Sequence, residues 1–200
     1  MENQDWKAQF KNEVEKQLSI LDKSQESKEH VIETLLDNFS AKMESINIDV
    51  FISEFKPKNQ RARAILDMAM YLWEYEGRFS FCINILCFLL VSNGHDLYDD
   101  RKKYITSFED VESVGISRKC EFLTHHGFGM LDEKKNKNLK KFRELRNDVA
   151  HYKLIIRDDG KIKGYNSKTR NWEEIPLLIV HGDLMEFSSD MLLILWQCIR

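Results

Sequence analysis

Proline and glycine are scarce in this chain of 200 residues, which contains only two prolines and eight glycines. So low a content argues against collagen-like repeats, loop-rich all-β folds and long disordered segments. The hydrophobic share is 42%, and a chain of this length can bury a core that needs neither disulfides nor metal. We therefore expect one domain over residues 1–200.

Paired cysteines and a long apolar run are also missing. The four cysteines (Cys82, Cys87, Cys120 and Cys198) show no C-x-x-C spacing, and three have apolar neighbours, where a free thiol behaves as a small hydrophobe. The longest near-apolar run, residues 79–91, is too short to cross a bilayer. The first residues are polar and lack a secretory apolar stretch. We expect a cytoplasmic, reduced protein without a membrane partner.

Charge of neither sign dominates, because 30 basic residues face 33 acidic ones and the net charge is −3. This balance excludes a globally basic nucleic-acid coat, so any RNA contact must come from a local patch. Metal and nucleotide motifs are lacking as well. His125 and His126 are adjacent, so in a helix they point about 100° apart. Gly127-Phe128-Gly129 lacks a following Lys-Ser/Thr, and no G-x-S-x-G occurs. We expect no metal site and no cofactor.

Helical periodicity fills the first half of the chain. Residues 6–21 and 27–43 carry apolar stripes at helical spacing: Trp6, Phe10, Val14, Leu18 and Leu21, then Val31, Leu35, Phe39 and Met43. Residues 46–55 fit either a strand or a helix capped by Asn47; the helix is favoured, and Pro57 ends it. A third helix is predicted from Asn59 to Glu76 with Gly77 as its C-terminal cap. Residues 79–93 are apolar on all sides, which predicts the buried centre of a bundle that Asn93-Gly94 stops.

The second half predicts shorter elements. An irregular stretch over 95–107 leads to a capping box from Ser107 to Asp110 that opens another helix. A second short helix is predicted at about 117–126. A long helix is predicted over 132–151, with Asp132 and Glu133 in its first turn and an apolar stripe of Leu139, Phe142, Leu145 and Val149. Three β-like runs follow at 153–157, 161–165 and 176–180, the first two joined by a turn at 158–160. A last helix is expected from Asp183 to Arg200.

This order predicts a mainly α fold. We expect an up-and-down helical bundle with an N-terminal helical extension over about 1–56. A small β-hairpin or meander insertion is expected at about 153–181, before the last helix.

The most informative segment runs from Lys134 to Tyr152, KKNKNLKKFRELRNDVAHY. Seven of the thirteen residues from Lys134 to Arg146 are Lys or Arg, and this run leads into Arg146-Asn147-Asp148-Val149-Ala150-His151. Arginine can hold a phosphate through two parallel N–H bonds, and histidine moves protons near neutral pH. These two groups can cleave RNA without metal, because His takes or gives the proton while Arg stabilises the growing charge. Arg118 and His125 fit a similar spacing by chance.

The string ELRNDVAHY resembles the R-x4–6-H signature of HEPN domains, in which a polar residue, here Asn147, usually follows the arginine. The resemblance implies an up-and-down helical bundle that dimerises, with the motif helices of two protomers forming one composite ribonuclease site. It also implies a toxin or an anti-phage defence effector, with a cognate antitoxin or regulatory protein as a partner. One departure stands out. Tyr152 follows His151 directly, whereas toxins inactivated by tyrosine modification resemble R-x4–6-H-x-Y.

Helix geometry independently favours a composite site. Residues five apart on one helix point about 140° from each other, so Arg146 and His151 of one chain do not easily clasp one phosphate. Asn147 and His151, four apart, share a face. We therefore predict a homodimeric, metal-independent endoribonuclease in which His151 is the general acid/base, Arg146 the phosphate clamp and Asn147 the orienting partner.

Asp148 and Tyr152 are supporting candidates for this site. A set of cations is predicted to guide RNA to it by charge: Lys134, Lys135, Lys137, Lys140, Lys141 and Arg143. The alternative is a non-catalytic HEPN-like module that uses the same helix for dimerisation or for binding RNA or protein.

Overall fold

The computed structural model describes residues 5–45, 59–98, 104–151, 153–166 and 168–200. It is mainly helical, with 71% of residues in helices, and one small antiparallel sheet precedes the last helix. This arrangement confirms the mainly α bundle with a β insertion. The segment 46–55, for which a capped helix was favoured, lies outside the described residues.

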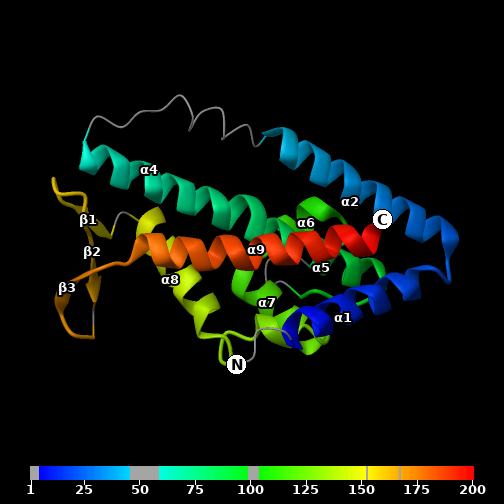
Figure 1. The fold of residues 1–200 in the computed structure, drawn as a ribbon. Helices are drawn as coiled ribbons and strands as arrows, with labels where there is room; N and C mark the ends of the chain where they lie inside the picture. Colours follow the sequence, from blue (N-terminus) through cyan, green and yellow to red (C-terminus); the bar gives the residue numbers. More distant parts are fainter. Residues whose placement is uncertain (1–4, 46–58, 99–103, 152, 167) are drawn as a thin grey trace.

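The first two helices form a pair at one end of the bundle (Figure 1). α1 covers Asp5–Leu21 and α2 covers Gln25–Ser45. Their predicted apolar stripes are confirmed as far as the side chains are described, because these residues are buried or pack against the core: Trp6, Phe10, Val14, Leu18, Leu21, Val31, Leu35 and Phe39. The helices of the expected N-terminal extension therefore share the core of the remaining chain.

A long helical run crosses the middle of the molecule and consists of three segments. α4 (Gln60–Trp73) is followed without a break by a π-helical segment, η1 (Glu74–Phe79), and by α5 (Ser80–Ser92). Asn59 caps the start, since its side chain accepts the N–H of Ala62 at 2.8 Å. The expected end at Gly77 is wrong. The chain widens into a π turn there, and Ser80 N–H bonds back to the carbonyl of Tyr75, five residues earlier.

The predicted buried centre is confirmed in α5. All ten residues from Phe81 to Leu90 are buried, and the helix ends at Asn93, where Gly94 adopts a positive φ of 82°. The whole run of 33 residues, Gln60–Ser92, is long and apolar enough to span a membrane by length and composition alone. However, 72% of its most apolar window is buried inside the molecule. The core helix of a folded domain has the same length and composition, so these two properties are weak evidence for a membrane span.

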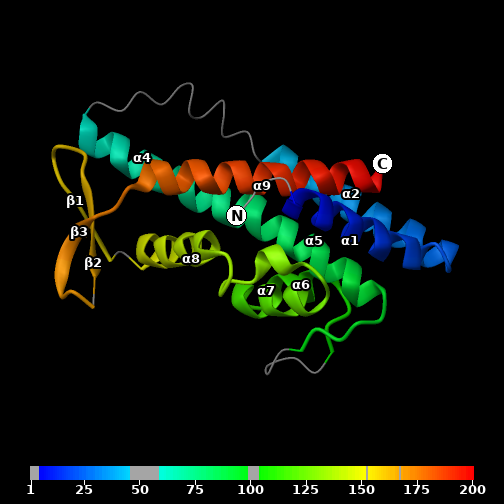
Figure 2. The same cartoon turned by 60° about the horizontal axis from the view of Figure 1, so that its bottom comes forward.

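Two short helices pack against α5. α6 (Phe108–Ser113) begins at Ser107, whose hydroxyl accepts the N–H of Asp110 at 3.1 Å as the capping box predicts. α7 (Ile116–His125) follows after Gly115, and a single 3₁₀ turn, η2, covers Gly129–Leu131. Together they form a corner beneath α5 in the view of Figure 2.

The motif helix, α8, covers Lys137–Ala150 and is shorter than expected. Asn136 caps it by accepting the N–H of Asn138 at 3.1 Å, so Asp132 and Glu133 lie in the turn before the helix and not in its first turn. The predicted stripe is confirmed, because four side chains are buried: Leu139, Phe142, Leu145 and Val149. The buried hydroxyl of Tyr71 in α4 donates to the carbonyl of Phe142 at 2.7 Å and fixes α8 against the bundle.

The β insertion is a three-stranded antiparallel meander in the order β1 (Leu154–Ile156), β2 (Ile162–Asn166) and β3 (Asn171–Glu174). The first two strands and the turn between them are as predicted, with Gly160 at a φ of 79°. Ile162 and Gly164 face inward; a Cβ on Gly164 would lie 2.6 Å from Cδ1 of Ile175. The sheet stands at one end of the bundle (Figures 1 and 2).

The predicted strand at 176–180 is wrong. The third strand lies earlier, at Asn171–Glu174, and residues 177–180 already belong to α9, which runs from Leu177 to Ile199. Pro176 stands at the N-cap position of this helix, where a missing N–H and a fixed φ cost little. α9 therefore begins six residues before the expected Asp183, and it packs along α1, η1, α4, α5 and α8.

Candidate functional site

An open cleft of about 740 Å³ lies beside the motif helix. Its walls come from three parts of the chain. η1 and the start of α5 contribute Tyr75, Glu76 and Ser80; α8 contributes Arg143, Arg146 and Asn147; and the remaining lining residues lie between Glu112 and Glu121, in α6, α7 and the turn joining them. Four cations and three carboxylates line this cleft: Arg118, Lys119, Arg143 and Arg146 with Glu76, Glu112 and Glu121.

The structure brings Arg146 and Asn147 together in this cleft. The Nη1 of Arg146 donates to Oδ1 of Asn147 at 3.2 Å, and its Nε forms an ion pair with Oε1 of Glu76 at 2.6 Å. The Arg146 side chain is 34% exposed, so a ligand in the cleft can reach it. The bond to Asn147 holds the guanidinium in place.

Arg143, predicted to guide RNA by charge, is held by two bonds to other parts of the chain. Its guanidinium donates to Oγ of Ser117 at 2.6 Å and forms an ion pair with Glu133 at 2.8 Å. These bonds connect α8 with the start of α7 and with the turn before α8. Gly115, the N-cap residue of α7, has no side chain to cap that helix, so the positive end of the helix dipole adds to the cations of the cleft.

A buried lysine supports the wall opposite α8. Lys119 is only 2% exposed, and its Nζ donates to Oδ1 of Asn84 at 2.6 Å and to the carbonyls of Val111 and Glu112 at 3.3 and 3.4 Å. Burial lowers its pKa from the usual 10.5, against nearby groups that raise it, first among them Cys87. The ammonium ties α7 to α5 and α6, so this wall of the cleft is rigid.

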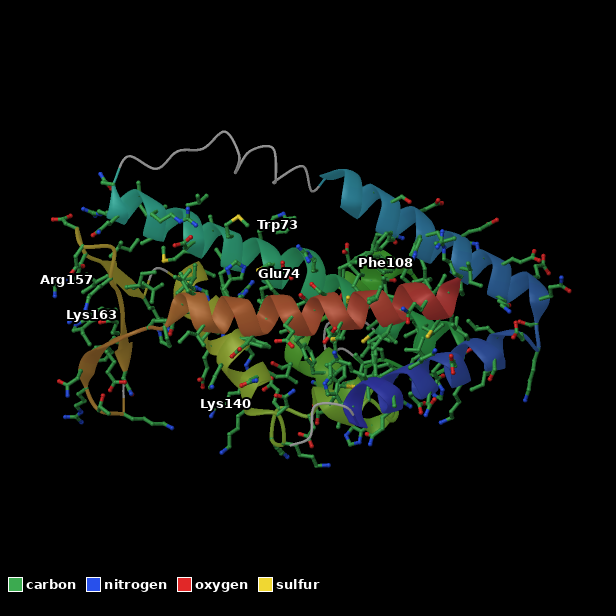
Figure 3. The ribbon with its side chains drawn as sticks, in the orientation of Figure 1. Trp73, Glu74, Phe108, Lys140, Arg157 and Lys163 are labelled. Atoms are coloured by element: carbon green, nitrogen blue, oxygen red, sulfur yellow. The ribbon has the colours of Figure 1, made fainter. Side chains whose placement is uncertain are left out.

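The π-helical segment has a second carboxylate that points the other way. Glu74 is 2% exposed, accepts a hydrogen bond from the hydroxyl of Ser188 in α9 and pairs with Nε of Arg78 at 3.3 Å. Burial raises its pKa above 4.5, although Ser188 and Arg78 act in the opposite direction. Figure 3 shows Glu74 between the long helical run and α9. Glu74 and Glu76, two residues apart, thus point to opposite sides of the helical run: Glu74 into the core and Glu76 to the cleft.

His151 lies apart from the cleft. It is the exposed C-cap residue of α8, where its N–H donates to the carbonyl of Asn147 at 3.0 Å, and its side chain is not part of the lining. Asp148 is partly buried and also lies outside the lining; burial raises its pKa above 3.8. Tyr152 lies outside the described residues. Within one chain, the structure therefore joins the predicted arginine and asparagine but not the histidine.

The predicted RNA-guiding lysines are all exposed. Lys137, Lys140 and Lys141 belong to α8, and Figure 3 shows Lys140 pointing away from the bundle. Lys134 and Lys135 lie in the turn before the helix. Two of the five form loose ion pairs: Lys135 with Asp132, and Lys140 with Glu144, both at 3.7 Å. None of the five lines the cleft, so any contact with RNA would occur outside it.

Two residues of the site were not predicted from the sequence. Glu76 meets Arg146 only because the long helical run passes α8, and Lys119 is buried only because α5 and α6 supply its acceptors. No local pattern marks either residue. Nor were Tyr165 and Trp172 singled out, although they form an exposed aromatic pair on the sheet.

Within the described residues, no group of three or more His, Cys, Asp or Glu side chains is placed to share a metal ion. Comparisons of the chain with known protein families, with curated proteins and with solved structures found no match.

Proposed function

We propose that the protein is a metal-independent endoribonuclease of the toxin or anti-phage defence type, with a HEPN-like composite site formed by two copies of the chain. Arg146 clamps the phosphate, Asn147 orients the guanidinium of Arg146 through their hydrogen bond, and His151 transfers the proton. The observation that carries the proposal is the open cleft beside α8, in which Arg146 and Asn147 are hydrogen-bonded to each other and accessible.

The separation of His151 from the cleft supports the two-chain form of this proposal. Arg146 and Asn147 line the cleft whereas His151 stands exposed at the helix end. Arg146 and His151 are five positions apart, about 140° around the helix; Asn147 shares a helix face with His151, yet only Asn147 lines the cleft. A two-fold partner presents the same surface twice, so the partner's histidine can approach the arginine of this chain. The homodimer, its RNA substrate, its cytoplasmic location and a cognate antitoxin or regulatory protein all belong to this proposal.

Cleavage in EDTA is the direct test. The purified protein should cut RNA with EDTA present and leave 2′,3′-cyclic phosphate ends, because His151 and Arg146 replace a metal in activating the 2′-hydroxyl and stabilising the phosphate. Activity that disappears in EDTA and returns with Mg²⁺ or Mn²⁺ would refute the metal-free mechanism. A protein that sediments as a monomer at micromolar concentration and cleaves at full rate would refute the composite site.

One observation favours a second function, a non-catalytic dimerisation or binding module. Arg146 is already paired with Glu76 at 2.6 Å, and this pair could simply brace α8 against η1. The two functions differ in the effect of His151→Ala, since only a ribonuclease loses cleavage, and growth arrest on overexpression, when this exposed side chain is removed.

A further inference from the structure

The outer face of the sheet carries two exposed aromatic side chains side by side. Tyr165 is 50% exposed and Trp172 is 44% exposed. They are direct partners across β2 and β3, with ring centroids 5.5 Å apart in an edge-to-face arrangement. The inner face, with Ile162 and Gly164, already provides the contact with the bundle. The contact between the two rings stabilises the sheet by about 0.2–1 kcal/mol, and about half of each residue still faces water.

Charged residues of both signs flank this aromatic pair, with a small excess of cations, and Glu174 is the direct cross-strand partner of Lys163. Residues 153–174 contain six Lys or Arg and four Asp or Glu, and two of the six are held in pairs, Arg157 with Asp159 and Lys161 with Glu174. Among the residues that the structure describes, no ion pair involves Lys163, Lys168 or Arg170. Lys163 lies on the central strand two residues before Tyr165, on the same face. Figure 3 shows Lys163 and Arg157 at the sheet end of the molecule, far from Lys140.

We propose that this outer face binds single-stranded RNA, with bases stacking on Tyr165 and Trp172 and Lys163 contacting a phosphate. Exposed aromatic side chains among unpaired cations are the two elements by which proteins hold single strands without sequence preference. Tyrosine and tryptophan are also frequent in protein–protein interfaces, but lysine is depleted there, so the lysines of this face favour RNA over a protein partner. Duplex RNA fits less well too, because its bases are already stacked and cannot pack on the rings.

The place of the sheet in the chain connects this surface with the motif. His151 and Leu154 are three residues apart, so their Cα atoms are separated by at most about 11 Å. A strand bound on the sheet would thus pass near the end of α8. The choice of RNA as the ligand rests on the proposed ribonuclease function, whereas stacking on the sheet does not depend on cleavage.

The test uses the full chain with His151→Ala, so that binding is measured without cleavage. Fluorescence anisotropy with a labelled 12-nucleotide single-stranded RNA gives the dissociation constant. Trp172→Ala and Tyr165→Ala should each weaken binding roughly 5- to 100-fold, and Trp172→Phe and Tyr165→Phe should keep most of the affinity because a ring remains. Tyr104→Ala removes an aromatic side chain that is 76% exposed outside the sheet, and it should leave binding unchanged.

Several results would overturn the proposal. One is an affinity for single-stranded RNA that neither Trp172→Ala nor Tyr165→Ala changes, and another is a loss of affinity that is as large in the Phe variants as in the Ala variants. The proposal also fails if the His151→Ala parent binds duplex RNA as tightly as single-stranded RNA, or binds no single-stranded RNA. Circular dichroism of every variant identifies any loss of fold, and the Phe variants keep the test valid if an alanine change disturbs the sheet. A parent that binds RNA through the sheet while the unmutated protein never cleaves it would refute the proposed function and leave this surface intact.

Discussion

The cleft and the outer face of the sheet both contain cationic side chains, but these are bonded to protein groups in the cleft, whereas the central lysine of the sheet forms no ion pair with the described residues. In the cleft, Arg146 and Arg143 are held by carboxylates, and Lys119 is buried among its acceptors. On the sheet, Lys163 forms no ion pair with the described residues, and Tyr165 and Trp172 contact chiefly each other. Groups fixed before a ligand arrives favour chemistry that needs geometry, whereas solvated groups favour tolerant binding. Changes in the cleft should therefore affect the cleavage rate, as at Arg146, or the stability of the cleft wall, as at Lys119, whereas changes on the sheet should chiefly affect the affinity for RNA.

The largest expected effect is on cleavage in the cleft. Arg146→Ala and His151→Ala should each lower kcat/KM about 10²- to 10⁴-fold, and the double change should cost little more because the two groups act as one unit. The melting temperature should hardly move, since a half-exposed ion pair contributes at most about 1 kcal/mol. Arg63→Ala, which breaks the pair with Asp67 on α4, is the control. Full activity in Arg146→Ala would show that the motif is coincidental.

The next effect is on the stability of the cleft wall. Asn84→Leu removes the closest acceptor of the buried Lys119 ammonium and leaves two carbonyls beyond 3.2 Å, which should cost about 3 kcal/mol. Lys119→Met removes the charge and leaves only neutral oxygens without this donor, those of Asn84, Val111 and Glu112, and should cost roughly 1–2 kcal/mol. Urea unfolding followed by circular dichroism measures both. A greater loss of unfolding free energy in Lys119→Met than in Asn84→Leu would contradict this interpretation.

Charge reversal on the exposed face of α8, outside the cleft, and on the sheet should have a smaller effect. The double change Lys140→Glu and Lys141→Glu on α8, and separately Lys163→Glu on the sheet, should weaken RNA binding several-fold. Each lost phosphate contact lowers the salt dependence of log Kd by about 0.7. Neither change should dissociate the proposed dimer in sedimentation. The control is Lys16→Glu on α1, where Lys16 pairs with Glu13. If this change lowers the affinity for RNA as much as Lys163→Glu does, the effect reflects the overall charge of the protein and not a local binding surface.

The smallest effect concerns pH and a partly buried histidine in α9. Burial lowers the pKa of His181 in α9 below 6.5; Arg78 acts in the same direction and Asp67 in the opposite one. The unfolded chain therefore binds a proton first, and the free energy of unfolding falls as pH drops from about 6.5 towards the lowered pKa. His181→Leu should reduce this loss in unfolding curves measured between pH 7 and 5. An identical pH dependence in the variant would show that His181 does not contribute to it.

The elements that could be predicted are those in which the spacing of apolar residues within the element itself marks its buried side. The apolar run of α5 and the stripe of α8 predict burial because each repeats over several turns. β3 was missed because all four of its residues are exposed, so no alternation marks it. The β-branched residues after Pro176 suggested a strand, yet packing of Leu177 and Val180 against the core selects a helix.

The candidate site was predictable to the same extent. Arg146 and Asn147 stand next to each other in the sequence and do meet in the cleft. Glu76 is 70 residues away from Arg146, and the acceptors of Lys119 come from α5 and α6. Contacts of this kind depend on how helices cross, which the spacing of residues within one helix does not contain.

The π turn at Glu74–Phe79 sets the rotational phase between α4 and α5. Each residue advances an α-helix by about 100°, and the wider turn accommodates one residue more than an α-helical turn does. Deleting a single residue there would produce an uninterrupted α-helix, but the buried side of α4 would then be rotated by about 100° relative to α5. The segment should consequently accept substitutions such as Gly77→Ala, whose new Cβ would lie 3.7 Å from the ring of Trp73, while one-residue deletions would misalign half of the bundle.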